Sequence, residues 1–224
     1  MKLDKQTISI LKNFSEINAN LLIKPGSELT VVSSMRNILA KATVKEVFDT
    51  EYGIYDLNNF LGVISMLGKP ELKLQEKLAN ITEENVKGGF KYWAAAKETL
   101  SIHDKPINMP EADVDFQIKE SELKKLKDAA GILGAPDLAI VGEKGGDVVL
   151  KVCDKKNTTS NTFDIVVGEN ATADYTFYCK VENMKMIEGD YDVKLSQKFI
   201  SHFKNTKLPI QYWIALEQDS KISK

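Results

Sequence analysis

The sequence predicts an α+β protein made of two similar domains, each with two helices packed on antiparallel sheets. Two observations lead to this fold class. Several segments recur after about 120 residues, and each half opens with an amphipathic helix pattern that short strand patterns follow. The chain has 224 residues, of which 43% are hydrophobic. That length and composition suffice for two small cores and exclude a globally disordered chain.

The strongest sign of duplication is a repeated Tyr-Trp pair. Both tryptophans follow a tyrosine, and Tyr92-Trp93 recurs as Tyr212-Trp213. Two more pairs of matching segments occur upstream in the same order, residues 73–77 with 194–198 and residues 21–23 with 138–140. We therefore expect an N-terminal domain at residues 1–110 and a C-terminal domain at residues 111–224. Residues 100–113, which contain Pro106 and Pro110, have no periodicity and predict an extended connector.

In the first half, the apolar spacing predicts a helix that begins after Asp4, a good N-cap residue. At about 100° per residue, Ile10, Phe14 and Ile17 fall on one side of this helix. Its lysines fall on the opposite side and are Lys2, Lys5 and Lys12.

In the second half, a helix is expected with Ser121 as its N-cap residue, and Gly134 and Pro136 are expected to end it. The residues that form its apolar stripe are Leu123, Leu126, Ala130 and Leu133. Lys124 and Lys125 lie away from this stripe, and Lys127 lies on its flank.

Short strand patterns separated by turn residues follow each helix, for example at residues 29–32 and 148–152. Second helices are expected at about residues 56–67 and, shorter, at 181–187. Further strands close each half, at residues 71–75, 92–95, 191–196 and 212–216. The order of these elements favours antiparallel sheets with helices on one face.

The charge balance restricts the classes of function. Thirty basic and 32 acidic residues give a net charge of −2, which argues against a globally basic DNA-coating protein. Arg36 is the only arginine, and lysine suits sequence-independent phosphate contact better than base reading. An AT-rich genome explains the same preference for lysine equally well. No apolar run is long enough to span a membrane, and the charged start predicts no signal peptide, so we expect a soluble intracellular protein.

No group of residues predicts a catalytic, metal or cofactor site. The two cysteines and two histidines are isolated from one another. The glycine-rich run at residues 142–147 lacks the Gly-Lys-Ser/Thr of a phosphate loop and predicts a hairpin turn. Asp113 and Asp115 could share a metal ion, but alternating acids near prolines are usually solvated. We therefore expect a protein that is not an enzyme.

The lysines opposite the two apolar stripes are the best candidate for a binding site. On one helix alone, such a face is usually just solvated. Here the same element carries positive charge in both halves of an acidic chain, which favours sequence-independent contact with phosphates.

Short motifs spread along the chain occur in the order and spacing of one known family. They are at residues 1–3, 11–14 and 17–18, at 54–58 and 60–62, at 183–186, 189 and 191, and at 215–217 and 219–220. Through them the whole chain resembles the sliding clamp, or DNA polymerase processivity factor, of T-even-type bacteriophages. Departures from the family pattern fall at residues 70–110, 140–175 and 196–208, and after Ser220.

The resemblance implies a DNA-clamp (processivity) fold in which three subunits form a head-to-tail ring around duplex DNA. It also implies an ATP-dependent clamp loader, a replicative DNA polymerase that docks by its C-terminal peptide, and late-transcription partners that include a sigma-like factor and a co-activator. The protein would then act in the cytoplasm of an infected bacterium. The expected pore-lining residues are Lys2, Lys5, Lys12, Lys124, Lys125 and Lys127.

In clamps generally, partner peptides dock by apolar anchors near the connector and the last strand. The candidates here are Ile102, Pro106, Ile107, Ile214 and Leu216. Ile214 and Leu216 fit plain sheet core equally well. The alternative function is a duplicated, non-catalytic structural or protein-binding subunit of a virus that does not encircle DNA.

Overall fold

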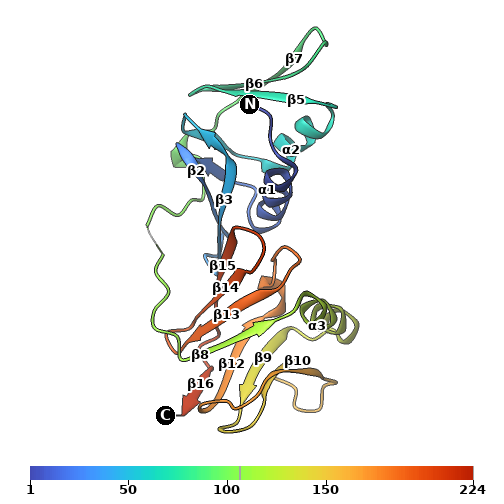
Figure 1. The fold of residues 1–224 in the computed structure, drawn as a ribbon, viewed down its shortest axis with the longest axis vertical. Helices are drawn as coiled ribbons and strands as arrows, with labels where there is room; N and C mark the ends of the chain where they lie inside the picture. Colours follow the sequence, from blue (N-terminus) through green and yellow to red (C-terminus); the bar gives the residue numbers. More distant parts are fainter. Residues whose placement is uncertain (106, 224) are drawn as a thin grey trace. The chain divides into compact units, whose positions relative to one another are not determined.

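The computed structural model describes residues 1–105 and 107–223 and divides into two compact units, Met1–Lys105 and Pro106–Lys224 (Figure 1). We describe each unit by itself. The expected boundary between residues 110 and 111 stays a prediction. Among the described residues, no helix combines the length and the apolar character that crossing a membrane requires.

The first unit contains two α-helices and seven strands among its described residues. Its elements are α1 (Lys5–Ile17), β1 (Leu21–Ile23), β2 (Gly26–Val32), β3 (Ile38–Phe48), β4 (Tyr52–Ile54), α2 (Leu57–Ser65), β5 (Pro70–Leu74), β6 (Leu78–Glu83), β7 (Gly89–Trp93) and the 3₁₀ turn η1 (Lys97–Thr99). All strand pairs within the unit are antiparallel, namely β1 with β4, β2 with β3, and β5-β6-β7 in that order. Helix α1 packs on the β2–β3 hairpin and beside α2.

The second unit repeats this order with one α-helix. Its elements are β8 (Val114–Ile118), α3 (Glu120–Leu133), β9 (Asp137–Gly142), β10 (Val148–Cys153), β11 (Phe163–Gly168), β12 (Asp174–Lys180), the 3₁₀ turn η2 (Val181–Asn183), β13 (Tyr191–Ser196), β14 (Ile200–Asn205), β15 (Ile210–Ala215) and β16 (Lys221–Ser223). One sheet has the order β11-β10-β9-β12-β16, and β8, β13, β14 and β15 pair in the second. Helix α3 packs on β10 and β11, as α1 does on β2 and β3. The predicted fold class is confirmed.

The start of α1 agrees with the sequence. The Asp4 carboxylate accepts a hydrogen bond from the backbone N–H of Gln6 at 2.8 Å, as an N-cap residue should. Ile10, Phe14 and Ile17 are buried, as their spacing predicts. The apolar stripe therefore fixes which side of α1 faces the core.

The N-cap residue of α3 lies two positions before the predicted one. Lys119, not Ser121, is its N-cap residue. Two carboxylates fix this earlier start of the helix. Glu122 accepts a hydrogen bond from the Lys119 N–H, and Asp190 accepts one from the Glu120 N–H, both at 2.9 Å. These bonds satisfy backbone donors that the helix leaves unpaired.

The end of α3 is as predicted, but its last apolar residue is not part of the buried stripe. Gly134 ends the helix in the left-handed conformation, with φ 63°. Leu133 is 36% exposed because the chain turns at Gly134, and Ala135 is buried instead.

The second predicted helix forms in the first unit only. There, Asp56 caps α2, accepting the Asn59 N–H at 3.0 Å. In the second unit, residues 181–187 form only the turn η2. Met184 and Met186 are both buried while Lys185 between them is exposed, an alternation typical of extended chain. Burial of both methionines outweighs the weak helix-forming tendency of seven residues.

The repeated tyrosines have matching roles in the two units. The Tyr92 hydroxyl donates to the carbonyl oxygen of Asp56 at 3.0 Å, where α2 begins. The Tyr212 hydroxyl accepts the Ile187 N–H at 3.1 Å, just after η2. Each tyrosine thus ties the last long strand of its unit to the segment around the second helical element. The tryptophans differ, because Trp93 is 69% exposed whereas Trp213 is buried.

Residues 142–147 form the predicted hairpin turn between β9 and β10. Gly145 has a φ of 78°, which favours glycine. Gly142 is required for a different reason. A Cβ atom there would overlap the ring of Tyr175 on the neighbouring strand β12.

We expect Gly142→Ala to destabilise the fold by about 1–3 kcal/mol, the usual cost of overpacking. Chemical unfolding of the variant and the parent measures this difference. In a Tyr175→Ala background, the same substitution should cost much less because the overlapping ring is gone. Equal costs in the two backgrounds would contradict the assignment of Gly142 to the Tyr175 contact.

We also expect stability to fall between about pH 7.5 and pH 5.5 because of His202. Burial, with smaller contributions from Lys194 and Lys204, lowers the pKa of His202 from 6.5 despite its hydrogen bond with Gln211. The unfolded chain therefore takes up the proton first as the pH falls, which favours unfolding. Replacing His202 with Gln should make the free energy of unfolding less dependent on pH in this range. An unchanged pH profile in that variant would assign the effect to other groups.

Candidate nucleic-acid interface on helices α1 and α3

The exposed face of α1 carries two lysines in a line. Lys5 and Lys12 are exposed and lie opposite the buried Ile10 and Phe14. Their positions in the sequence differ by seven, so they are about 10 Å apart along the helix. Across residues 1–105 and 107–223, neither forms an ion pair with a carboxylate within 4.0 Å. Their charges are thus available to an external anion.

Strand β3 holds the N-terminus of α1 in place. The Glu46 carboxylate accepts hydrogen bonds from the Asp4 N–H and, at 2.6 Å, from the Thr7 hydroxyl. Lys45 contacts the other oxygen of the Asp4 carboxylate at 2.9 Å. The Lys45 hydrogen bond, helped by the Gln6 N–H, lowers the pKa of Asp4. The cap therefore stays ionised near neutral pH and orients the helix that carries Lys5 and Lys12.

Helix α3 presents the corresponding face of the second unit. Lys124 and Lys125 are exposed, whereas Leu123 and Leu126 are buried. Lys127 is half-buried at the flank of the apolar stripe and already has an interaction within the protein. The structure therefore places Lys124 and Lys125 where the sequence predicts, and it makes Lys127 less available to an anion.

Lys2 does not join the line of lysines on α1. It lies in the segment before the helix, where the backbone of Met1 pairs with Leu72 of β5. Its ammonium group lies 3.7 Å from Glu71 and 3.6 Å from Glu84. These two acids direct the Lys2 charge toward the β5–β6 side of the unit. Helical periodicity could not reveal this, because Lys2 precedes the cap.

Sequence reasoning missed a neutral polar face on α2, which lies beside α1 (Figure 1). The exposed polar side chains of this face are Asn58, Asn59 and Ser65, with Gly62 between them. They lie opposite the buried Leu57, Phe60 and Ile64. A search for charge could not find them. The signal that could have found them is the spacing of three and four residues opposite an apolar stripe.

The predicted partner-binding residues fall into different environments. Ile214 is fully buried and Leu216 is 5% exposed, and the Leu216 N–H donates to the Phe199 carbonyl at 2.9 Å. In the described structure these two side chains are sheet core, the alternative that the sequence left open. Ile102 and Ile107 are partly exposed, and Pro106 lies outside the described residues.

The groups that could support other chemistry have structural roles here. Within the described part of the chain, no three His, Cys, Asp or Glu residues are grouped to hold a metal ion. The Asp113 carboxylate accepts the Gln197 N–H at 2.8 Å, which fixes a turn. Burial raises the pKa of Cys179 to about 12, so its thiol is a poor nucleophile.

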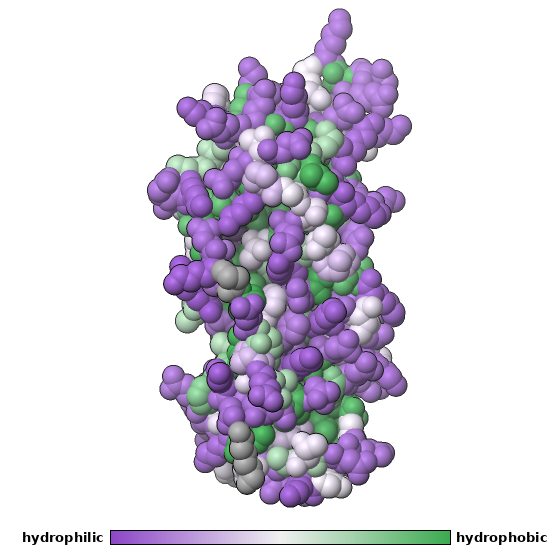
Figure 2. Space-filling model, turned by 60° about the vertical axis from the view of Figure 1, so that its left-hand side comes forward, coloured by the Kyte–Doolittle hydropathy of each residue, from purple (hydrophilic) through white to green (hydrophobic). Residues whose placement is uncertain are grey.

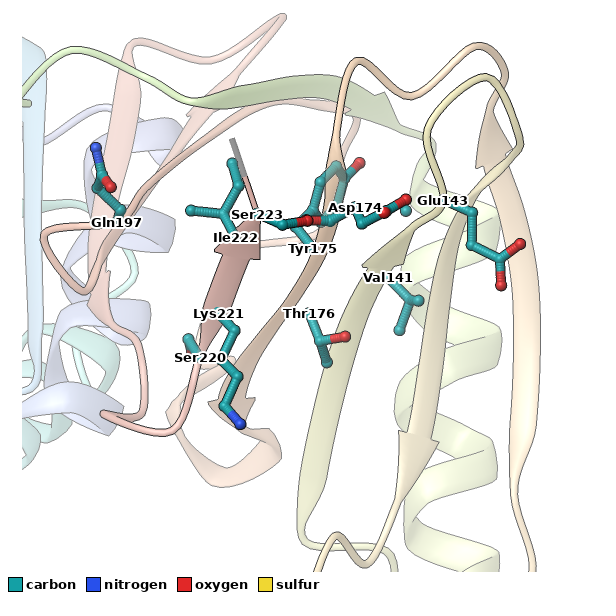
Figure 3. Close-up of a pocket in the computed structure, with 11 residues that line it drawn as sticks. Val141, Glu143, Asp174, Tyr175, Thr176, Gln197, Ser220, Lys221, Ile222 and Ser223 are labelled. Atoms are coloured by element: carbon teal, nitrogen blue, oxygen red, sulfur yellow. The ribbon is translucent and has the colours of Figure 1, made fainter.

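A hollow of about 750 Å³ lies on the second unit where β9, β12 and β16 meet (Figure 3). Val141, Thr176 and Lys221 come from three successive strands and are direct cross-strand neighbours. The Asp174 carboxylate in this hollow already accepts the Lys144 N–H at 2.8 Å. The surface drawn in Figure 2 is mainly hydrophilic, with apolar residues in small separate areas.

Two family models match the chain, one in each half. The model described as DNA polymerase processivity factor matches residues 2–102. The model described as gp45 sliding clamp, C terminal, matches residues 115–218.

Solved structures show the same fold at low sequence identity. A structure of the PCNA2-PCNA3 complex from Sulfolobus tokodaii matches with a TM-score of 0.70 and 13% identity, covering 95% of this chain and 96% of that one. The A. fulgidus PCNA bound to the C-terminal region of FEN-1 matches with a TM-score of 0.69 and 12% identity, covering 96% of each chain.

Curated relatives match over nearly their full length. The sliding clamp of Vibrio phage KVP40 is 31% identical over 223 residues, covering 97% of this chain and 99% of that protein. The sliding clamp of Escherichia phage RB69 is 30% identical and covers 98% of each. With two family models, these relatives and the clamp fold in agreement, the chain belongs to the phage sliding-clamp family of DNA polymerase processivity factors.

Proposed function

We propose that this protein is a sliding clamp that closes as a homotrimeric ring around duplex DNA and tethers the viral replicative DNA polymerase. The observation that carries the proposal is the pair of exposed lysine faces, Lys5 and Lys12 on α1 and Lys124 and Lys125 on α3. Lysine contacts to phosphates are individually weak and independent of sequence. A ring held by topology can therefore slide, and the tether itself needs no catalytic group.

Two free sheet edges support head-to-tail assembly. Strand β7 is an edge of its sheet in the first unit, and β11 is an edge in the second. Trp93 on β7 is 69% exposed and Val166 on β11 is 49% exposed. Exposed edge strands tend to pair with another chain. Pairing β7 of one copy with β11 of the next is a heterologous contact, which closes into a ring when its rotation divides the circle.

The proposal includes the partners that such a ring requires. An ATP-dependent clamp loader would open and place it, and the polymerase would dock through a C-terminal peptide. Ile102 and Ile107 are the partly exposed anchor candidates for that peptide. A related fold, A. fulgidus PCNA, is bound by the C-terminal region of FEN-1. We extend the proposal to late-transcription partners, a sigma-like factor and a co-activator, in the cytoplasm of the infected host.

Reversing the exposed helix charges tests DNA encirclement. The test changes four lysines together to Glu, namely Lys5, Lys12, Lys124 and Lys125. We expect this variant to lose all stimulation of the polymerase on long templates, because its ring would repel phosphates. Light scattering should still find a trimer, since these side chains lie on neither sheet edge. Primer extension with the cognate polymerase and clamp loader measures the effect.

A matched control keeps the net charge of that variant. Lys73, Lys87, Lys156 and Lys198 are exposed and lie off the helices, and changing them together to Glu should leave long synthesis largely intact. Equal loss in the two variants would point to net charge alone. Full activity of the helix variant would refute the assignment of these lysines to the DNA-facing surface. Failure of the parent to remain on circular DNA would favour the alternative of a structural or protein-binding subunit.

Changing Val166 to Glu tests the sheet-edge contact. The parent should scatter light with three times the mass of one 25.0 kDa chain. The variant should scatter as a single chain, because burying an unpaired carboxylate at the β7–β11 contact is unfavourable. Circular dichroism should show an unchanged fold, since Val166 is 49% exposed. A trimer that persists in the variant at low concentration would exclude this edge.

A further inference from the structure

Two glycines occupy exposed helical positions where the chain itself gives no reason for glycine. Gly62 is the sixth residue of α2, and Gly131 is the twelfth of α3. A Cβ atom at either position would meet no atom within 4 Å, and neither residue has the positive φ that favours glycine. Gly53 differs, because a Cβ atom there would overlap the Ala95 carbonyl oxygen.

Glycine inside a helix destabilises it relative to alanine, because glycine loses more backbone entropy on folding. At Gly62 and Gly131, neither tighter packing nor a special backbone turn within the protein offsets this loss of stability. Glycine also serves where a ligand must approach the backbone closely. The space left by the missing side chain therefore points to a molecule outside the chain.

The groups around both glycines are suited to an anion. Gly131 follows the exposed Lys124 by seven residues, so the two lie on one side of α3. Gly62 follows Asn58 and Asn59 by four and three residues, and both amides are exposed. Lysine ammonium and asparagine amide groups are both donors to phosphate oxygens.

The helix that packs against α2 also carries positive charge. Helix α2 packs against α1, which carries the exposed Lys5 and Lys12 (Figure 1). Each unit thus combines one exposed helical glycine with exposed lysines on the same or the adjacent helix. This charge favours a polyanion over an apolar partner.

We propose that Gly62 and Gly131 are close-approach positions, where the sugar–phosphate backbone of duplex DNA comes nearest to the helices of the ring. This inference rests on the proposed function and adds two uncharged residues to the proposed DNA-facing surface. Because no side chain intervenes, a phosphate can come close to the helix surface while the nearby lysines and asparagines reach its oxygens.

The test replaces each glycine by alanine, singly and together, in the full chain. Thermal unfolding should show higher midpoints for Gly62→Ala and Gly131→Ala, since alanine favours the helix. Fluorescence anisotropy at low salt, with a duplex of about 30 base pairs and arbitrary sequence, measures DNA binding. We expect the double variant to bind about threefold or more weakly than the parent, because each added methyl group holds the phosphate away.

Ser121→Ala is the matched control. It replaces an exposed serine in the first turn of α3, outside the lysine and asparagine groups named above, and it adds no bulk, so its midpoint should not fall and DNA binding should stay at the parental level. Glycine variants that are more stable and bind DNA as well as the parent would overturn the inference, as would glycine variants that are less stable than the parent. If the parent itself binds no duplex at any salt concentration, the proposed function fails with it.

Discussion

The structure depends on the burial of one apolar stripe on each long helix. Ile10 and Phe14 of α1 and Leu123 and Leu126 of α3 are almost fully buried against their hairpins. Burying a side chain of this size contributes about 1.5–3 kcal/mol, more than one exposed charge contributes. The stripe that builds the core therefore also fixes the direction of the lysines. Because α1 and α3 lie on corresponding hairpins, each unit presents exposed lysines on the outer face of its long helix.

Polar contacts adjust the helices that apolar burial positions. Glu46 holds the first turn of α1 from β3, and Asp190 holds the first turn of α3 from the segment before β13. Tyr92 and Tyr212 tie the second helical elements to the sheets. These contacts join residues that are distant in sequence, so each rigid helix is held from more than one element. In the proposed clamp, rigid helices would keep the spacing of weak, repeated phosphate contacts.

The two units also differ, and the differences follow from local sequence. The second helical element is α2 in the first unit and only a 3₁₀ turn in the second, because Met184 and Met186 are both buried in extended chain. Trp93 is exposed on an edge strand, whereas Trp213 stacks on His202 with ring centroids 4.8 Å apart. A duplicated fold thus keeps its core positions while the surfaces of the two copies diverge.

The sequence alone determined the fold class, the duplication, the core faces of α1 and α3 and the exposure of their main lysines. Periodicity is a local property, so it can be read along the chain. Tertiary structure decided the rest. It placed Lys2 beside Glu71 and Glu84, moved the α3 cap to Lys119, and buried Ile214 and Leu216. Each of these outcomes depends on residues far away in the chain, and no local pattern encodes which distant groups will meet.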